Sequence, residues 1–291
     1  MSIWASFFCI KYIGDKMKVF TNDEFIKKLK WLVNKVPNVY YSGKNWSKLN
    51  NQGKWQFDCV LSIKSILWGF RADKKLFRGG TVYKSNGVAD FSCNGALNYC
   101  TGVSRDFTNL IPGEYLCMKG TKYNHSGIYL GNGKVFEDTT GWGKKKAIIS
   151  DISTTGVRSL NGVKNLKWTY HGKLKYIDYD EYYEKRKKLV MELQDDLNKE
   201  WNCGLAVDGS FGPKTTKACS KHQLTYGIKT KLMVKWLQKR LISFGYSVGP
   251  AKIDGNFGPD TLKAVKKFQK DYGLKVDGIV GKNTYKKLVC C

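Results

Sequence analysis

One cysteine and one histidine in this sequence have the neighbours that thiol chemistry requires. Cys59 directly follows Asp58, and the apolar residues after it recur at helical spacing: Val60, Leu61, Ile63, Ile66, Leu67 and Phe70. We expect Asp58 to cap a buried helix, which would place Cys59 at its first turn, where the helix dipole favours the thiolate. His125 immediately precedes an apolar run at 126–130 that predicts a strand. A thiol beside an imidazole predicts nucleophilic attack on a carbonyl carbon, although a lone cysteine on an apolar helix face is more often structural.

Composition limits the classes of protein to which the chain can belong. The 291 residues are enough for two or three domains, and a hydrophobic content of 42% is ordinary for a folded protein. A formal net charge of +26 favours an anionic partner, either nucleic acid, a wall polymer or a membrane surface. Nine cysteines without a CxxC pair and only three histidines make a zinc site improbable, and no cofactor is expected. No apolar run reaches the roughly 20 residues of a membrane span.

The first two thirds of the chain predict an α+β domain. An amphipathic helix begins at Asn22 and stops before Pro37, and the Cys59 helix follows a polar loop. Residues 71–109 are rich in turns and are expected to form one wall of a groove. Strands are then predicted at 115–118, 126–130, 135–137, 147–149 and 175–177.

The turn between the second and third of these strands decides which acid faces His125. If Asn132-Gly133 alone forms the turn, strand alternation puts Asp138 on the His125 face. If residues 131–133 form a three-residue loop, Gly127 pairs with Glu137, and Glu137 lies diagonal to His125. Alternation along the strands leaves both registers open.

A resemblance to a known family becomes specific at these motifs. The chain resembles the NlpC-type cysteine peptidase family in three places: Phe57-Asp58-Cys59, the segment 127–133 after His125, and Tyr40 ahead of Gly43. It also resembles the catalytic domain of clostridial phage endolysins, over the segments 57–69, 79–88 and 118–125. The resemblance implies a papain-like domain with an antiparallel sheet. It implies that Cys59 is the nucleophile, His125 the base, Glu137 the residue that orients it, and Tyr40 a neighbour of the oxyanion site. Substrate-binding roles are assigned to Asp58, Asn86, Asp90 and Trp142.

This chain also departs from the family pattern. Val60 and Leu61 follow the cysteine, where the family commonly has Ser and Gly, and Glu137 stands where a histidine is common. A carboxylate can still fix the tautomer of an imidazole and stabilise the imidazolium, so activity remains the expectation.

An internal repeat follows the change of composition near residue 178. Val207-Asp208-Gly209-Ser210-Phe211-Gly212-Pro213 recurs as Ile253-Asp254-Gly255-Asn256-Phe257-Gly258-Pro259, and a shorter echo surrounds Asp277. Asp-Gly predicts a turn, and the proline predicts the first turn of a helix, so each copy reads as part of a small helical unit. The repeats resemble peptidoglycan-binding modules, whose marker residues here are Asp208, Phe211, Asp254, Phe257 and Asp277.

These observations predict five segments. Residues 1–16 are expected to lie outside the fold, with Met17 an alternative start; 17–178 form the peptidase domain, 179–188 a linker, 189–229 a partial peptidoglycan-binding module and 230–291 a complete one.

The predicted function is that of an endolysin-like peptidoglycan hydrolase. The expected target is the bond between γ-D-glutamate and the diamino acid of the stem peptide; the alternative is an N-acetylmuramoyl-L-alanine amidase. An alternative of another class is a non-catalytic basic wall-binding protein. Peptidoglycan and anionic wall polymers are the expected partners of a monomer, and nucleic acid is not expected because no recognition motif or stacking platform is found. Lacking a signal peptide, the chain is expected to be made in the bacterial cytoplasm and released through a phage holin.

Overall fold

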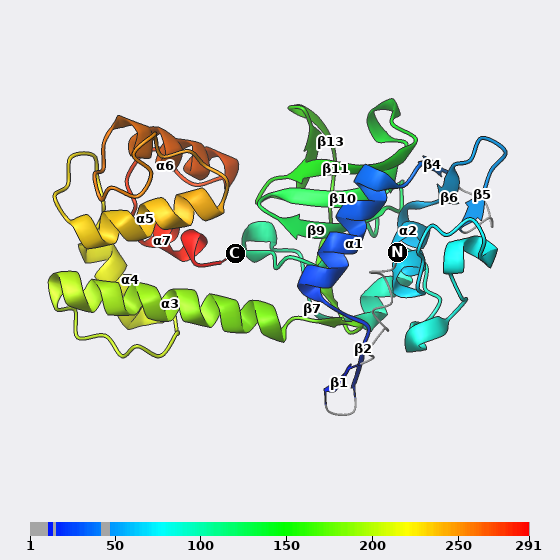
Figure 1. Ribbon diagram of the computed structural model, residues 1–291, viewed down its shortest axis with the longest axis horizontal. Coiled ribbons are helices and arrows are strands. Elements are labelled where there is room, and N and C mark those ends of the chain that lie inside the picture. Colours follow the sequence, from blue (N-terminus) through cyan, green and yellow to red (C-terminus); the bar gives the residue numbers. More distant parts are fainter. Residues whose placement is uncertain (1–10, 14–15, 42–46, 291) are drawn as a thin grey trace, which may run out of the picture. The chain divides into compact units, whose positions relative to one another are not determined.

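The computed structural model describes residues 11–13, 16–41 and 47–290, which form a mixed α+β protein (Figure 1). The chain divides into two compact units, Met1–Asp180 and Glu181–Cys291. The described residues contain seven α-helices, two in the first unit and five that lie wholly or almost wholly in the second.

A large antiparallel sheet forms the centre of the first unit. Its eight strands lie in the order β13-β12-β11-β10-β9-β8-β14-β7. Their bounds are β7 Cys100–Ser104, β8 Tyr115–Cys117, β9 Ser126–Gly131, β10 Lys134–Thr139, β11 Lys146–Ile152, β12 Val157–Leu160, β13 Val163–Lys167 and β14 Tyr170–Leu174. The four strands predicted between residues 115 and 149 are confirmed as β8 to β11. The strand predicted at 175–177 is wrong: β14 ends at Leu174, and a separate short strand, β15 (Ile177–Asp178), follows it.

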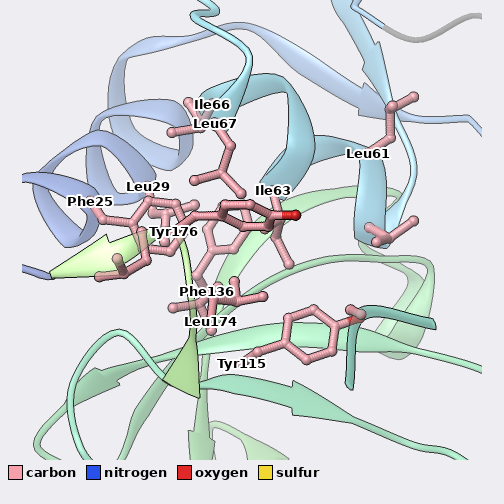
Figure 2. Close-up of a cluster of buried hydrophobic side chains, with 14 of the residues drawn as sticks. Phe25, Leu29, Leu61, Ile63, Ile66, Leu67, Tyr115, Phe136, Leu174 and Tyr176 are labelled. Carbon is pink, nitrogen blue, oxygen red and sulfur yellow. The ribbon is translucent and has the colours of Figure 1, made fainter. Parts of the chain in front are cut away.

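Two helices cover one face of this sheet. Helix α1 (Asn22–Lys35) begins with a capping box in which Thr21 and Glu24 satisfy each other's backbone amides, and α2 (Cys59–Leu67) is buried along its whole length. Figure 2 shows the resulting core, where Phe25 of α1 and Ile63 of α2 pack near Phe136 of β10. Both helices are therefore held by apolar burial against the strands that carry the polar side chains.

Smaller sheets complete the first unit. The strands β4 (Asn38–Tyr40), β6 (Trp55–Phe57) and β5 (Lys48–Leu49) form a three-stranded sheet, in which Tyr40 is paired in parallel with Phe57. β3 (Phe20–Thr21) pairs in parallel with β15.

Residues 11–13 and 16, in the segment expected to lie outside the fold, belong to a separate two-stranded sheet. Strand β1 (Lys11–Ile13) pairs with β2 (Lys16–Lys18), while residues 1–10 lie outside the described residues.

The second unit is helical. Its helices are α3 (Asp180–Trp201), α4 (Pro213–Lys221), α5 (Lys231–Ser243), α6 (Pro259–Asp271) and α7 (Lys282–Leu288). Trp236, Phe257 and Phe268 are fully buried in its core. Pro213 and Pro259 stand at the first turns of α4 and α6, as the repeat predicts. The predicted linker at 179–188 is instead the start of α3. Among the described residues, no helix has the length and apolarity needed to span a membrane.

Candidate active site

Cys59 stands at the first position of α2 because its neighbours on both sides are fixed. Phe57 is fully buried at the end of β6, and Asp58 is extended, with φ −102° and ψ −179°. One oxygen of Asp58, Oδ1, accepts hydrogen bonds from the amides of Val60 at 3.0 Å and Leu61 at 2.7 Å. The predicted helix cap is thereby confirmed. It leaves the Cys59 thiol, 7% exposed, at the amino end of the helix.

His125 meets Glu137 through a hairpin that differs in detail from both predicted registers. Asn132 and Gly133 both have positive φ, 52° and 67°, so the turn has two residues. The pairing then shifts from Gly131 with Lys134 to Tyr129 with Val135, which is a bulge in β9.

The bulge restores the register that the three-residue loop was expected to give. Because Tyr129 pairs with Val135, the continuing strands set Glu137 diagonal to His125. The imidazole Nε2 of His125 lies 2.7 Å from Oε2 of Glu137. The predicted three-residue loop is therefore wrong, but the predicted contact between these two side chains is present.

The Glu137 carboxylate is fully buried and has two further partners that sequence reasoning missed. Ser150 of β11 donates its hydroxyl to Oε1. Arg158 of β12 donates through Nη2 to Oε2 and through Nε, at 3.4 Å, to Oε1. Arg158 stands 21 residues beyond Glu137 in a strand that was not predicted, and no local motif marks it.

Aromatic rings enclose this polar group. The Trp168 ring stacks on the His125 imidazole, with centroids 5.3 Å apart and an interplanar angle of 16°. The Arg158 guanidinium lies 5.3 Å from the centroid of Trp168 and 4.8 Å from that of Trp142. Trp142 itself, in the short 3₁₀ turn after β10, donates its indole N–H to the Val163 carbonyl at 3.1 Å. These rings limit the movement of the imidazole and of the guanidinium.

The thiol environment corrects one expectation. The hydrogen bond with Cys93 and burial raise the pKa of the Cys59 thiol well above its usual value, and the contact with His125 lowers it only in part. The predicted bias toward thiolate from the helix dipole is thus outweighed, and Cys59 rests as a thiol. Burial lowers the pKa of His125, but hydrogen bonds with Cys59 and Glu137 raise it above the usual value overall.

Tyr40 and Asp138 lie in the same environment as Cys59. Burial, followed by the nearby Cys59 and Asp58, raises the pKa of the Tyr40 hydroxyl, so that this group stays protonated and can donate a hydrogen bond. Asp138 is fully buried, neither of its oxygens has a hydrogen-bond partner among the described residues, and burial raises its pKa well above the usual range. Burial thus favours the protonated form of Asp138.

The other two predicted substrate-binding residues, Asp90 and Asn86, bond to groups other than Cys59 and His125. The Asp90 carboxylate forms an ion pair with Lys64 of α2 and accepts a hydrogen bond from Tyr83 at 2.9 Å. Asn86 donates to the Leu67 carbonyl at 2.8 Å, at the carboxyl end of α2. Since a nine-residue helix is roughly 12 Å long, the structure does not bring Asn86 to Cys59.

In the second unit, each Asp-Gly repeat is built around one glutamine. The Gln238 amide donates to Asp254 at 2.7 Å and to Thr261 at 3.1 Å, and its oxygen accepts from the Gly255 amide at 2.9 Å. The same hydrogen bonds recur with Gln194 in the first copy and with Gln269 in the third. The three repeats predicted from sequence are therefore three copies of one structure.

The marker residues of the repeats mostly serve this structure. Each aspartate, Asp208, Asp254 and Asp277, also accepts from the amide two residues later. Phe257 is fully buried, and Phe211 packs against the same core. These side chains therefore shape the units.

Comparison with known proteins assigns a family to part of the second unit. A search of curated proteins found no match to the chain. Residues 230–288 match the family model described as "Putative peptidoglycan binding domain", and a C-terminal peptidoglycan-binding domain is therefore found in this protein.

Proposed function

We propose that the protein is a peptidoglycan hydrolase of the papain-like type, in which Cys59 attacks an amide carbonyl of the stem peptide. The observation that carries the proposal is the buried pairing of His125 with Glu137 at 2.7 Å, next to a thiol at the start of a helix. The peptidoglycan-binding domain at 230–288 supports the choice of substrate, because it would hold the enzyme on the wall.

The proposed first step is a proton transfer coupled to attack. With Nε2–H of His125 donating to Glu137, Nδ1 is the ring nitrogen that accepts the thiol proton. Because Cys59 rests as a thiol, deprotonation accompanies attack instead of preceding it. The sulfur bonds to the carbonyl carbon, and the electron pair of the C=O bond moves to its oxygen.

The tetrahedral intermediate then collapses. His125 protonates the leaving amine, the C–N bond breaks and a thioester remains on Cys59. Water, deprotonated by the same imidazole, hydrolyses that thioester and restores the thiol. The Cys59 amide, which has no partner within the first turn of the helix, and the protonated Tyr40 hydroxyl are the proposed donors to the oxyanion.

We assign the scissile bond to the γ-D-glutamyl link to the diamino acid, as the resemblance of the catalytic motifs implies. The amide between muramic acid and L-alanine, and a protein that binds walls without cutting them, are the other outcomes that an assay must separate.

Wall lysis by a cysteine variant tests the proposal. Cys59→Ala should lose lysis of purified walls by several orders of magnitude and still pellet with them, because the binding domain is untouched. Cys100→Ala is the matched control: this thiol lies in the same unit and contacts the Ala96 carbonyl at 3.3 Å. Lysis retained by Cys59→Ala would overturn the thiol mechanism.

A further inference from the structure

The strongest unexplained feature of the first unit is a buried arginine beside the Glu137 carboxylate. Arg158 is 3% exposed, and its Nε and Nη2 engage the two oxygens of Glu137 in the paired geometry that a guanidinium favours. Oxygen Oε2 is shared with His125, and Oε1 with Ser150. The carboxylate is thus held from β11, from β12 and from the residue that precedes β9.

We propose that Arg158 is a positioning residue: clamped between Trp142 and Trp168, it holds the Glu137 carboxylate ionised and aimed at Nε2 of His125. This inference rests on the proposed function, because it concerns the same imidazole. Trp168 connects the two parts of the arrangement, since one ring contacts both Arg158 and His125.

The charges explain why a cation is useful at this position. A fully buried carboxylate is costly unless it is paired, and His125 supplies a positive charge only while it is protonated. Arg158 supplies a permanent one, so Glu137 stays ionised when the imidazole is neutral and ready to accept a proton.

Arg158 also influences how tightly the His125–Glu137 pair binds a proton. The other titratable groups near this pair are Cys59 on α2 with Cys93 and Tyr40 beside it, Asp58 at the start of that helix, and Asp138 on β10. Among the groups named here, Arg158 is the fixed cation. Its removal should make the pair bind its proton more tightly, whichever member carries that proton.

Two substitutions separate charge from geometry. Arg158→Met removes the charge, and the acidic limb of the pH profile of kcat/KM on soluble muropeptide should move up by about one pH unit. Arg158→Lys keeps the positive charge, so the acidic limb of the pH profile should stay in place. The lysine ammonium group, however, does not reproduce the paired hydrogen bonds that the guanidinium makes with Glu137. For this variant kcat/KM should fall by roughly ten- to a hundredfold. Arg105→Met is the matched control, because Arg105 is an exposed arginine 4.9 Å from the Tyr170 ring centroid.

A second readout does not depend on hydrolysis. In the full chain carrying Cys59→Ala, the imidazole of His125 can be titrated by NMR, with and without Arg158→Met. A titration that moves to higher pH supports the proposal even if the protein proves not to be a hydrolase. An unmoved midpoint overturns it. If Arg158→Met fails to fold, the lysine variant decides, because unchanged kcat/KM in that variant would overturn the positioning role.

Discussion

Tyr129 of β9 pairs with Val135 of β10, and this pairing determines which acid meets His125. Val135 packs on the sheet face that carries Trp168, and Phe136 packs on the opposite face, under the helices. By alternation, Glu137 shares the face of Val135, and Asp138 shares that of Phe136. Two adjacent carboxyl groups therefore have different environments: Glu137 bonds to three side chains, and Asp138 has no hydrogen-bond partner in the part of the chain that the structure describes.

This contrast predicts different effects for two conservative substitutions. Glu137→Gln should lower kcat by roughly two to four orders of magnitude, because a neutral amide does not stabilise the imidazolium or enforce its tautomer. Asp138→Asn should change little, because no hydrogen bond to Asp138 from the described residues would be lost and an amide has nearly its shape. Steady-state kinetics on soluble muropeptide measure both. A larger loss for Asp138→Asn would mean that Asp138, not Glu137, serves the imidazole.

The second prediction concerns the contact between Cys93 and the nucleophile. The hydrogen bond with Cys93 is the largest cause of the raised pKa of Cys59, so Cys93→Ala should lower that pKa toward the usual range. The thiolate fraction then rises about tenfold for each pH unit by which the pKa falls. Alkylation of Cys59 by iodoacetamide at fixed pH, followed by peptide mass spectrometry, should be faster in this variant and unchanged in Cys100→Ala. Slower alkylation would contradict the assigned direction.

A third prediction is a pH dependence of stability from His171. Its two ring nitrogens face Glu114 Oε2 at 2.9 Å and the Asp106 carbonyl at 2.8 Å. Burial is the largest single influence and lowers the pKa of His171, but the interactions with Glu114 and Asp106 together raise that pKa overall. When the pKa of a histidine is higher in the folded state, its protonation stabilises the fold. This contribution is fully present below the pKa of the unfolded state, about 6.5, and is lost as pH rises through the pKa of the folded state.

Urea unfolding of the first unit can measure this contribution. The free energy of unfolding lost in His171→Asn should be larger at about pH 5.5 than at about pH 9. His222→Asn, in the second unit, should leave the unfolding of the first unit unaltered at both pH values. A loss for His171→Asn that grows with pH would show that the sign is wrong.

The fourth prediction concerns the glutamine at the centre of each repeat. Gln238→Ala removes the partners of Asp254, Thr261 and the Gly255 amide together, and should lower the free energy of unfolding of the second unit by about 2 to 4 kcal/mol. Gln223→Ala is the control, since this side chain is exposed and donates to the Ser220 carbonyl at 3.1 Å. Its cost should stay within about 0.5 kcal/mol. Equal losses in the two variants would refute the central role of Gln238.

Local patterns were sufficient to predict some parts of this protein. The helix cap at Asp58 depends on neighbouring residues, and the Asp-Gly-x-Phe-Gly-Pro repeat carries its own turn and helix start. The short separation of His125 from Glu137, twelve residues and one hairpin, limited the partner of His125 to Glu137 or Asp138, and the family resemblance chose Glu137. The bulge that produces this contact was not predictable, because it depends on how one glycine-rich turn meets the sheet.

Features built by distant segments were missed. Arg158 comes from β12, a short strand with no marked alternation, and it reaches Glu137 across β11. The thiolate expected from the helix dipole was wrong because Cys93, far along the chain from Cys59, comes to lie beside it. Sequence periodicity gives the secondary structure, but the electrostatics of a buried site depend on which segments the tertiary fold brings together.

The most direct test of the account is mass spectrometry of purified peptidoglycan after digestion by the full chain. The proposed mechanism predicts new free γ-carboxyl groups on D-glutamate and new amino termini on the diamino acid, formed by the unmodified protein and absent after treatment with Cys59→Ala. Free L-alanine amino termini would instead identify the muramoyl amide as the bond cut. The same new termini appearing with Cys59→Ala would contradict a thiol mechanism at this site.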